Sequence, residues 1–392
     1  MARAPRQRQQ GMPAGPADSA RAKGGAPGAA RASDGPSASE LQGTAVGSDP
    51  AGVGRAATCY AAIDLGTNNC RLLVARPAAD GFKVVDAFSR IVRLGEGVTR
   101  SRTLSEAAMA RAIDALGVCA AKVRRRPGCR LRAVATAACR QALNRNAFLE
   151  RVRRETGLEL EVIDPQEEAR LALGGCAPLL DARVPNGLIF DIGGGSTELC
   201  WLTLPAGGDA AADGPGAAQP ELVAWHSMPV GVANLAERFA GAPDTPETYE
   251  AMVARTADAL SAFAGDGEVT RAFAGRPVQM VGASGTVTTL AGVAKDLPRY
   301  DRRQVDGTEL SAETVRATSR RIAAMTPAER QQHPCIGPQR ADLVIAGCAI
   351  LEAICQAWPV ERLTVADRGL REGILYHLMQ ERGEPVASMP PL

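Results

Sequence analysis

One arrangement of residues that suits phosphate binding occurs twice in the chain. Residues 62–73 read AIDLGTNNCRLL, and residues 189–200 read IFDIGGGSTELC. In each copy a short apolar strand ends at an aspartate, Asp64 or Asp191, and a turn of small residues led by glycine connects it to a second apolar strand. Glycine permits a tight turn and leaves room beside the backbone. Successive N–H groups of such a turn can converge on phosphate oxygens.

The two aspartates suit a metal ion better than the phosphate itself. A carboxylate beside phosphate oxygens is repelled, whereas a divalent cation binds carboxylate, phosphate and water oxygens together, as Mg²⁺ prefers. Each copy is therefore interpreted as one half of a metal-phosphate clamp. Two such halves in facing domains would hold one ligand across a cleft. The alternative is a pair of unrelated β-hairpins whose turns contain glycine.

The segments around these turns alternate between strand-like and helix-like patterns, which is typical of an α/β fold. Strands are predicted at residues 61–64, 70–76, 82–93, 131–136, 160–163, 187–191, 197–204, 277–282 and 362–366. Helices are predicted at residues 105–126, 144–156, 165–173, 245–263, 311–324 and 340–358. Ser105 and Thr245 are the predicted starts of two of these helices.

Two segments have a composition that does not support a packed core. Residues 1–57 are rich in Ala, Gly, Pro, Ser and Arg and contain no aromatic residue, which predicts a disordered tail. Residues 205–220 are similarly simple and separate two strand-like runs, which predicts a surface hairpin loop. The predicted organisation is the tail at 1–57, an N-terminal domain at 58–184 and a C-terminal domain at 185–384.

Overall composition argues against several classes of protein. The net charge is only +2, which does not indicate nucleic-acid binding. No apolar run is long enough to span a membrane. The ten cysteines are scattered without a Cys-x-x-Cys pair, which predicts core thiols in a reducing cytoplasm. A basic run lies at Lys122, Arg124, Arg125, Arg126, Arg130 and Arg132. It could guide a polyanion, but we favour solvated helix-end positions.

The doubled loop resembles the two phosphate motifs of the actin, sugar-kinase and Hsp70 superfamily. From about residue 60 to 382 the sequence is similar to one branch of it, the Ppx/GppA family of exopolyphosphatases and guanosine pentaphosphate phosphatases. The most specific stretch is DIGGGSTE at 191–198. The others are VRLGEGV at 92–98, ATAACRQALN at 135–144, EVIDPQEEARL at 161–171, GTVTTLA at 285–291, RAD at 340–342 and ADRGLREG at 366–373. Ser284 departs from the pattern, since many relatives have glycine there.

The resemblance implies a fold and a set of residue roles. The fold would be two RNase H-like (actin-like ATPase) domains flanking a central cleft. Glu168 would orient the attacking water, and Asp191 and Glu198 would complete the catalytic set. Asp191, Asp64 and Glu198 would bind Mg²⁺ or Mn²⁺. Arg93 would hold two phosphate oxygens at once, and Arg140 could do similar work. The expected phosphate-binding amides belong to Gly66, Thr67, Asn68, Asn69, Gly193, Gly194, Gly195 and Ser196.

The implied activity is an exopolyphosphatase that releases terminal phosphate from inorganic polyphosphate by metal-assisted attack of water. The alternative substrate is guanosine pentaphosphate (pppGpp), which would place the protein in the stringent response as well as in phosphate metabolism. A small-molecule kinase of the same fold would need an adenine pocket and an acceptor site. A non-catalytic polyphosphate- or alarmone-binding protein would not need Glu168. Whether the chain forms a homodimer is left open.

Overall fold

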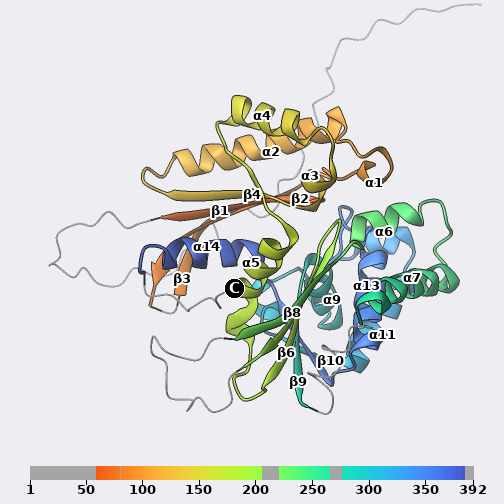
Figure 1. The fold of residues 1–392 in the computed structure, drawn as a ribbon. Helices are drawn as coiled ribbons and strands as arrows, with labels where there is room; N and C mark the ends of the chain where they lie inside the picture. Colours follow the sequence, from red (N-terminus) through yellow and green to blue (C-terminus); the bar gives the residue numbers. More distant parts are fainter. Residues whose placement is uncertain (1–58, 80, 205–219, 265–275, 385–392) are drawn as a thin grey trace, which may run out of the picture. The chain divides into compact units, whose positions relative to one another are not determined.

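The computed structural model describes residues 59–79, 81–204, 220–264 and 276–384. The predicted tail at 1–57 and all but the last residue of the predicted loop at 205–220 lie outside these ranges. Two β-sheets with helices packed on both faces form the described fold (Figure 1). None of the described helices is long and apolar enough to cross a membrane.

The first sheet has five strands in the order β3-β2-β1-β4-β5. These are β1 (Tyr60–Leu65), β2 (Asn69–Ala78), β3 (Gly81–Ile91), β4 (Arg130–Ala135) and β5 (Glu161–Val162). Alternate residues of a strand point to opposite faces, and β1 is apolar on both. Ile63 packs toward α2 (Glu106–Arg124) and α4 (Arg145–Thr156), while Ala62 packs toward α14 (Leu370–Gln380). Figure 1 shows α2 and α4 on one side of this sheet and α14 on the other.

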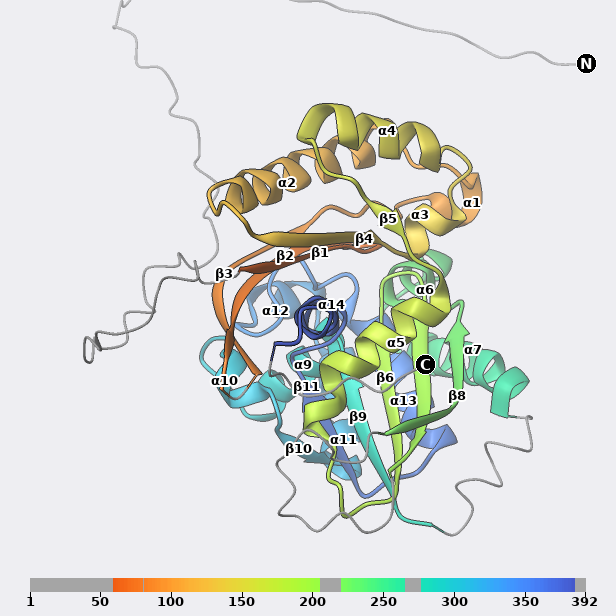
Figure 2. The same ribbon diagram turned by 60° about the vertical axis from the view of Figure 1, so that its left-hand side comes forward.

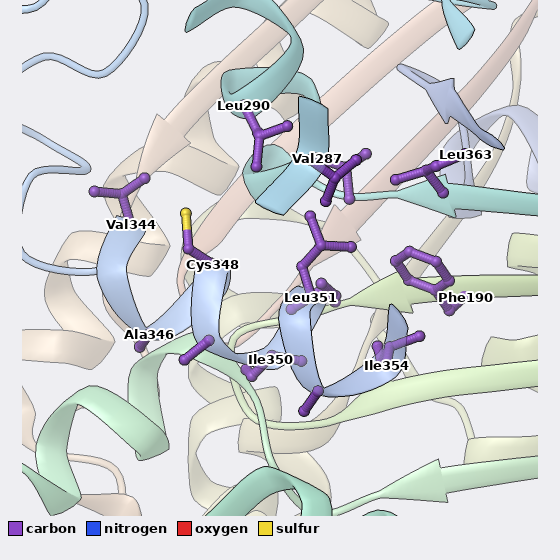
Figure 3. Close-up of a cluster of buried hydrophobic side chains, with 14 of the residues drawn as sticks. Phe190, Val287, Leu290, Val344, Ala346, Cys348, Ile350, Leu351, Ile354 and Leu363 are labelled. Atoms are coloured by element: carbon purple, nitrogen blue, oxygen red, sulfur yellow. The ribbon is translucent and has the colours of Figure 1, made fainter. Parts of the chain in front are cut away.

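The second sheet has six strands in the order β10-β11-β9-β6-β7-β8. These are β6 (Asn186–Ile192), β7 (Thr197–Thr203), β8 (Glu221–Met228), β9 (Val278–Ala283), β10 (Glu309–Ser311) and β11 (Arg362–Ala366). Its main core lies against α13 (Val344–Ala357) and α9 (Gly285–Ala294), where Phe190 packs among aliphatic side chains (Figure 3). The other face packs against α5 (Pro165–Cys176).

The remaining helices are short or flank these layers. They are α1 (Val98–Ser101), α3 (Ala137–Gln141), α6 (Val232–Arg238), α7 (Pro246–Ala264), α10 (Arg302–Val305), α11 (Ala312–Ala324), α12 (Pro327–Gln332) and the 3₁₀ turn η2 (Ala177–Leu179). Ser105 caps α2, accepting from the N–H of Ala108, and Thr245 accepts from the N–H of Thr248 at the start of α7. Both predicted helix starts are therefore confirmed.

Two helices, α5 and α14, cross with their backbones in contact (Figure 2). A Cβ added to Gly373 would lie 1.8 Å from the Leu171 carbonyl oxygen, and one added to Gly175 would lie 2.0 Å from that of Gly369. The sequence placed α14 in a C-terminal domain at 185–384, yet its apolar side packs on the first sheet. The position of a boundary between two domains stays a prediction.

Several predicted details differ from the structure. The helix predicted to begin at residue 340 begins at Val344, because residues 337–343 form turns. The helix α9 was not predicted, since its Thr and Val residues have low helix propensity. Burial compensates for that propensity, because eight of its ten residues are buried.

The cysteines and most of the basic run have structural roles. All ten cysteines are free thiols, and eight of them are buried, as predicted. Lys122 and Arg126 both pair with Asp86 at 2.8 Å, and Arg132 pairs with Glu161 and Glu167. These charges hold the first sheet to α2 and α5 and are not free to guide a polyanion.

Candidate active site

Both glycine-led loops open into one pocket of about 310 Å³. Every predicted clamp residue in them lines it: Asp64, Gly66, Thr67, Asn68, Asn69, Asp191, Gly193, Gly194, Gly195 and Ser196. Glu168 and Glu198 line it as well. The structure therefore brings together, from both sheets and from α5, the residues that the repeat singled out.

The two loops have the same turn. In the first, the N–H of Gly66 donates to the carbonyl of Asn69 at 2.9 Å, and in the second the N–H of Gly193 donates to the carbonyl of Ser196 at 2.9 Å. Each turn begins two residues after the strand aspartate. The two copies therefore share a backbone hydrogen bond at the same position of the turn, in addition to their sequence pattern.

The loops also touch each other through Thr67. A Cβ on Gly194 would lie 2.9 Å from the Thr67 Cβ, and one on Gly195 would lie 2.8 Å from its hydroxyl. A Cβ on Gly95 would lie 2.3 Å from the Thr67 methyl. The glycines therefore allow the close approach of the two loops.

The carboxylates of Asp64 and Asp191 face the pocket without a hydrogen bond or ion pair to any described residue. Burial raises the pKa of Asp191 to about 6, with Asp64 adding to the increase and Arg71 and Arg371 opposing it. Burial raises the pKa of Asp64 in the same way. Two enclosed carboxylates without partners are an arrangement that a bound cation would stabilise.

Glu168 lies in the first turn of α5, which begins where Asp164 accepts from the N–H of Glu167 at 2.8 Å. Its Oε2 accepts from Arg140 Nη1 at 2.6 Å. Burial raises the pKa of Glu168 to about 7, although Arg140 opposes the increase. Glu167 points elsewhere and pairs with Arg170 and Arg132, as expected from its place on the helix.

Glu198 is buried beside the second loop. Its Oε1 accepts from the hydroxyls of Ser196 at 2.7 Å and Ser227 at 3.0 Å. Burial, together with nearby Glu168, raises the pKa of Glu198 well above its usual value. The two hydroxyls hold the side chain in one orientation.

Arg93 lies beside the first loop, where its backbone N–H donates to the Asn68 carbonyl at 3.0 Å, but its side chain turns elsewhere. It is not among the pocket-lining residues, and its guanidinium pairs with Asp342 at 2.8 Å with both side chains nearly half exposed. Arg140 reaches the pocket only through Glu168. The roles of Arg93 and Arg140 as phosphate ligands stay predictions.

Several pocket residues were missed by sequence reasoning. They are chiefly the arginines Arg71, Arg340, Arg368 and Arg371, with Tyr300 and Asp367. The hydroxyl of Tyr300 donates to Asp367 at 2.7 Å, and Arg340 donates to Thr289 at 3.0 Å. The stretch at 366–373 was noticed as a motif, but nothing in its spacing indicated which of its side chains enters the pocket.

Ser284, the departure from the family pattern, begins α9 at the edge of the pocket. Its φ of 153° lies in the region that favours glycine. Its hydroxyl accepts from the N–H groups of Thr286 and Val287, both at 3.1 Å. The cap offsets the cost of the backbone conformation.

The described lining is more acidic than basic, with six carboxylates and four arginines. A chain of phosphates would be repelled by this balance unless cations accompanied it. No three His, Cys, Asp or Glu side chains of the described residues converge into a complete metal site. Asp64 and Asp191 nevertheless fit Mg²⁺, because that ion is usually bound by one or two carboxylates together with substrate phosphates and water.

Known proteins share this arrangement of sheets and helices. Residues 73–382 match the Ppx/GppA phosphatase family. The chain belongs to this family. It is 29% identical over 340 residues to exopolyphosphatase 2 of Mycobacterium tuberculosis, covering 82% of this chain and 99% of that protein. The family relationship makes the protein a hydrolase, a phosphatase.

Solved structures confirm the two-sheet α/β fold of this family. The crystal structure of an exopolyphosphatase-like protein is 32% identical with a TM-score of 0.71, covering 83% of this chain and 98% of that one. The Ppx/GppA family member from Aquifex aeolicus is 28% identical with a TM-score of 0.65 over the same shares. The predicted α/β class is therefore confirmed.

Proposed function

We propose that the protein is an exopolyphosphatase that hydrolyses the terminal phosphoanhydride bond of inorganic polyphosphate. The observation that carries this proposal is the pair of matching loops, whose unpartnered aspartates face one pocket together with Glu168. The exopolyphosphatase names of its relatives support the substrate class.

In this proposal each set of residues has one task. The loop amides of residues 66–69 and 193–196 bind phosphate oxygens and align the chain. Glu168, kept in place by Arg140, orients a water for in-line attack on the terminal phosphorus and accepts its proton as the bridging P–O bond breaks. Asp64 and Asp191, with Glu198 beside them, would hold Mg²⁺ or Mn²⁺, which when bound neutralises phosphate charge.

Guanosine pentaphosphate is the second candidate substrate. Its favouring observation is that Tyr300, Leu343 and Val344 line the same pocket. A phosphate chain alone needs no aromatic or aliphatic contacts, whereas a nucleoside does. The substrate, a possible homodimer and a cytoplasmic location stay predictions.

The test compares phosphate release from long polyphosphate and from guanosine pentaphosphate with Mg²⁺ and with Mn²⁺. We expect Glu168→Gln to lower kcat by roughly 10²–10⁴-fold, the usual contribution of a positioned acid or base. Glu167→Gln is the matched control, because the Glu167 side chain pairs with Arg170 and Arg132 and does not line the pocket. This variant should leave kcat unchanged.

The outcomes separate the candidate functions. Equal rates for wild type and Glu168→Gln would remove Glu168 from the mechanism. Binding of polyphosphate without release of phosphate would make the protein a binding protein, and ADP formation from ATP with an acceptor would make it a kinase. The ratio of the two rates identifies the substrate.

A further inference from the structure

Arg371 is a pocket residue with no assigned role. It is the second residue of α14, and its side chain lines the pocket beside the two loops. It makes no hydrogen bond and no ion pair with any residue in the described ranges. Burial lowers the pKa of its guanidinium, as expected for a cation withdrawn from water.

Carboxylates lie near Arg371, although none of them in the described ranges forms an ion pair with it. Its neighbour Glu372 is taken by Arg302 at 3.0 Å and by the N–H of Gly369 at 3.0 Å. Asp64 and Asp191 are close enough for Arg371 to act on the pKa of both, yet neither forms an ion pair with it. The guanidinium and the two aspartates therefore border the same space without closing it.

Other arginines of the lining are differently placed. Arg340 donates to Thr289, and Arg368 pairs with Asp306. Arg71 resembles Arg371 in having no partner among the described residues, but it lies on β2 directly opposite Asp64. Arg371 alone approaches the loops from a helix N-terminus, where the backbone also favours an anion.

A partly buried cation without a partner is less stable than one whose donors are satisfied. Because Arg371 lines a cavity and its donors have no acceptor among the described residues, we infer that a ligand supplies the acceptors. Guanidinium presents its donors as a planar fork that matches two oxygens of one phosphate.

We propose that Arg371 binds the non-bridging oxygens of a phosphate held between Asp64 and Asp191, and that it does the work expected from sequence of Arg93. The inference rests on the proposed function, since it takes the ligand to be a phosphate chain. Arg371 then neutralises charge on the phosphate, while Glu168 orients the attacking water and accepts its proton.

The experiment uses Arg371→Met, which removes charge and donors at similar volume, and Arg371→Lys, which keeps the charge but loses the fork. Arg362→Met is the control, because that arginine is exposed on β11 and its one ion pair within the described ranges is with Glu309. Three quantities are measured: kcat/KM for polyphosphate, the Tm of ligand-free protein, and the rise in Tm on adding tripolyphosphate with Mg²⁺.

We expect Arg371→Met to lower kcat/KM by about 100-fold or more, as for loss of one aligned donor to a reacting group. Its ligand-free Tm should equal or exceed that of wild type, because a partly buried charge without a partner among the described residues has been removed. The rise in Tm with tripolyphosphate should largely disappear. Arg371→Lys should fall between the two, and Arg362→Met should match wild type.

Three results would overturn the inference. The first is Arg371→Met with wild-type kcat/KM or a wild-type response to tripolyphosphate. The second is a lower ligand-free Tm in both Arg371 variants with activity lost in proportion, which would show a structural role. If wild type hydrolyses neither substrate, the proposed function fails, and the tripolyphosphate response still decides the role of Arg371. A wild type that does not respond to tripolyphosphate overturns it too.

Discussion

The crossing of α5 and α14 predicts that Gly373→Ala is strongly destabilising. The new Cβ would lie 1.8 Å from the Leu171 carbonyl oxygen and 2.7 Å from its carbon. Ordinary contact needs about 3.5 Å, so the two helices would have to separate by roughly 1.5 Å. The obstacle is backbone, which cannot rotate away as a side chain can.

The size of the effect follows from what separation disturbs. Overpacking a core costs about 1–3 kcal/mol, and a backbone obstacle puts this site at the upper end, about 3 kcal/mol. The helix propensity of alanine returns only about 1 kcal/mol. The net loss is then about 2 kcal/mol, and at about 2–4 °C per kcal/mol, the scale for domains of 150–250 residues, the Tm should fall by about 4–8 °C. Activity should fall as well, because α5 carries Glu168 and α14 carries Arg371.

Gly117→Ala is the matched control. Gly117 lies within α2, and a Cβ there would meet nothing within 4 Å. This variant should gain roughly 0.5–1 kcal/mol. Thermal unfolding of both variants, followed by circular dichroism in one buffer, is the assay. A Tm for Gly373→Ala within 1 °C of wild type would refute the backbone contact.

Three further predictions concern the pocket. Since burial raises the pKa of Glu168 to about 7, its base form predominates only above that pH. The value of kcat/KM should therefore fall as pH drops through about 7 and level off above it. A profile that is flat from pH 5 to 8 would contradict this. Chelation of divalent cations should abolish phosphate release, and Asp191→Asn should raise the Mg²⁺ concentration for half-maximal rate at least about tenfold; an unchanged Mg²⁺ requirement would remove Asp191 as a ligand. Gly95→Ala should destabilise the protein through its contact with the Thr67 methyl, and Thr67→Ser should relieve much of that loss in a double-mutant cycle; strictly additive effects would show that the two residues do not touch.

Much of the site followed from local pattern. The Asp64 and Asp191 loops were predictable because a strand, an aspartate and a glycine-led turn are adjacent in sequence, so short-range geometry determines where the amides point. The choice of Glu168 followed from the family resemblance. The structure places Glu168 against Arg140 in the pocket and Glu167 against Arg170.

The arginines could not be predicted in the same way. Arg93 belongs to a recognisable motif, but its partner Asp342 lies 249 positions further along the chain. Arg371 reaches the loops because α14 returns from the second sheet to pack on the first. Such placements depend on tertiary packing between segments far apart in sequence, for which periodicity and spacing carry no signal.

Three glycines from two of the family's motifs surround the side chain of Thr67. Gly95 comes from the Arg-Leu-Gly segment, and Gly194 and Gly195 come from the second loop, yet all three surround one threonine side chain. Because these glycines have no side chains, they leave room for Thr67 as well as for phosphate. The segment that contains Gly95 and the second loop look independent in the sequence. The size of Thr67, in the first loop, nevertheless restricts both to glycine at these positions. A substitution at position 67 that increases its size would therefore require compensation in both, and the three segments should change together or not at all.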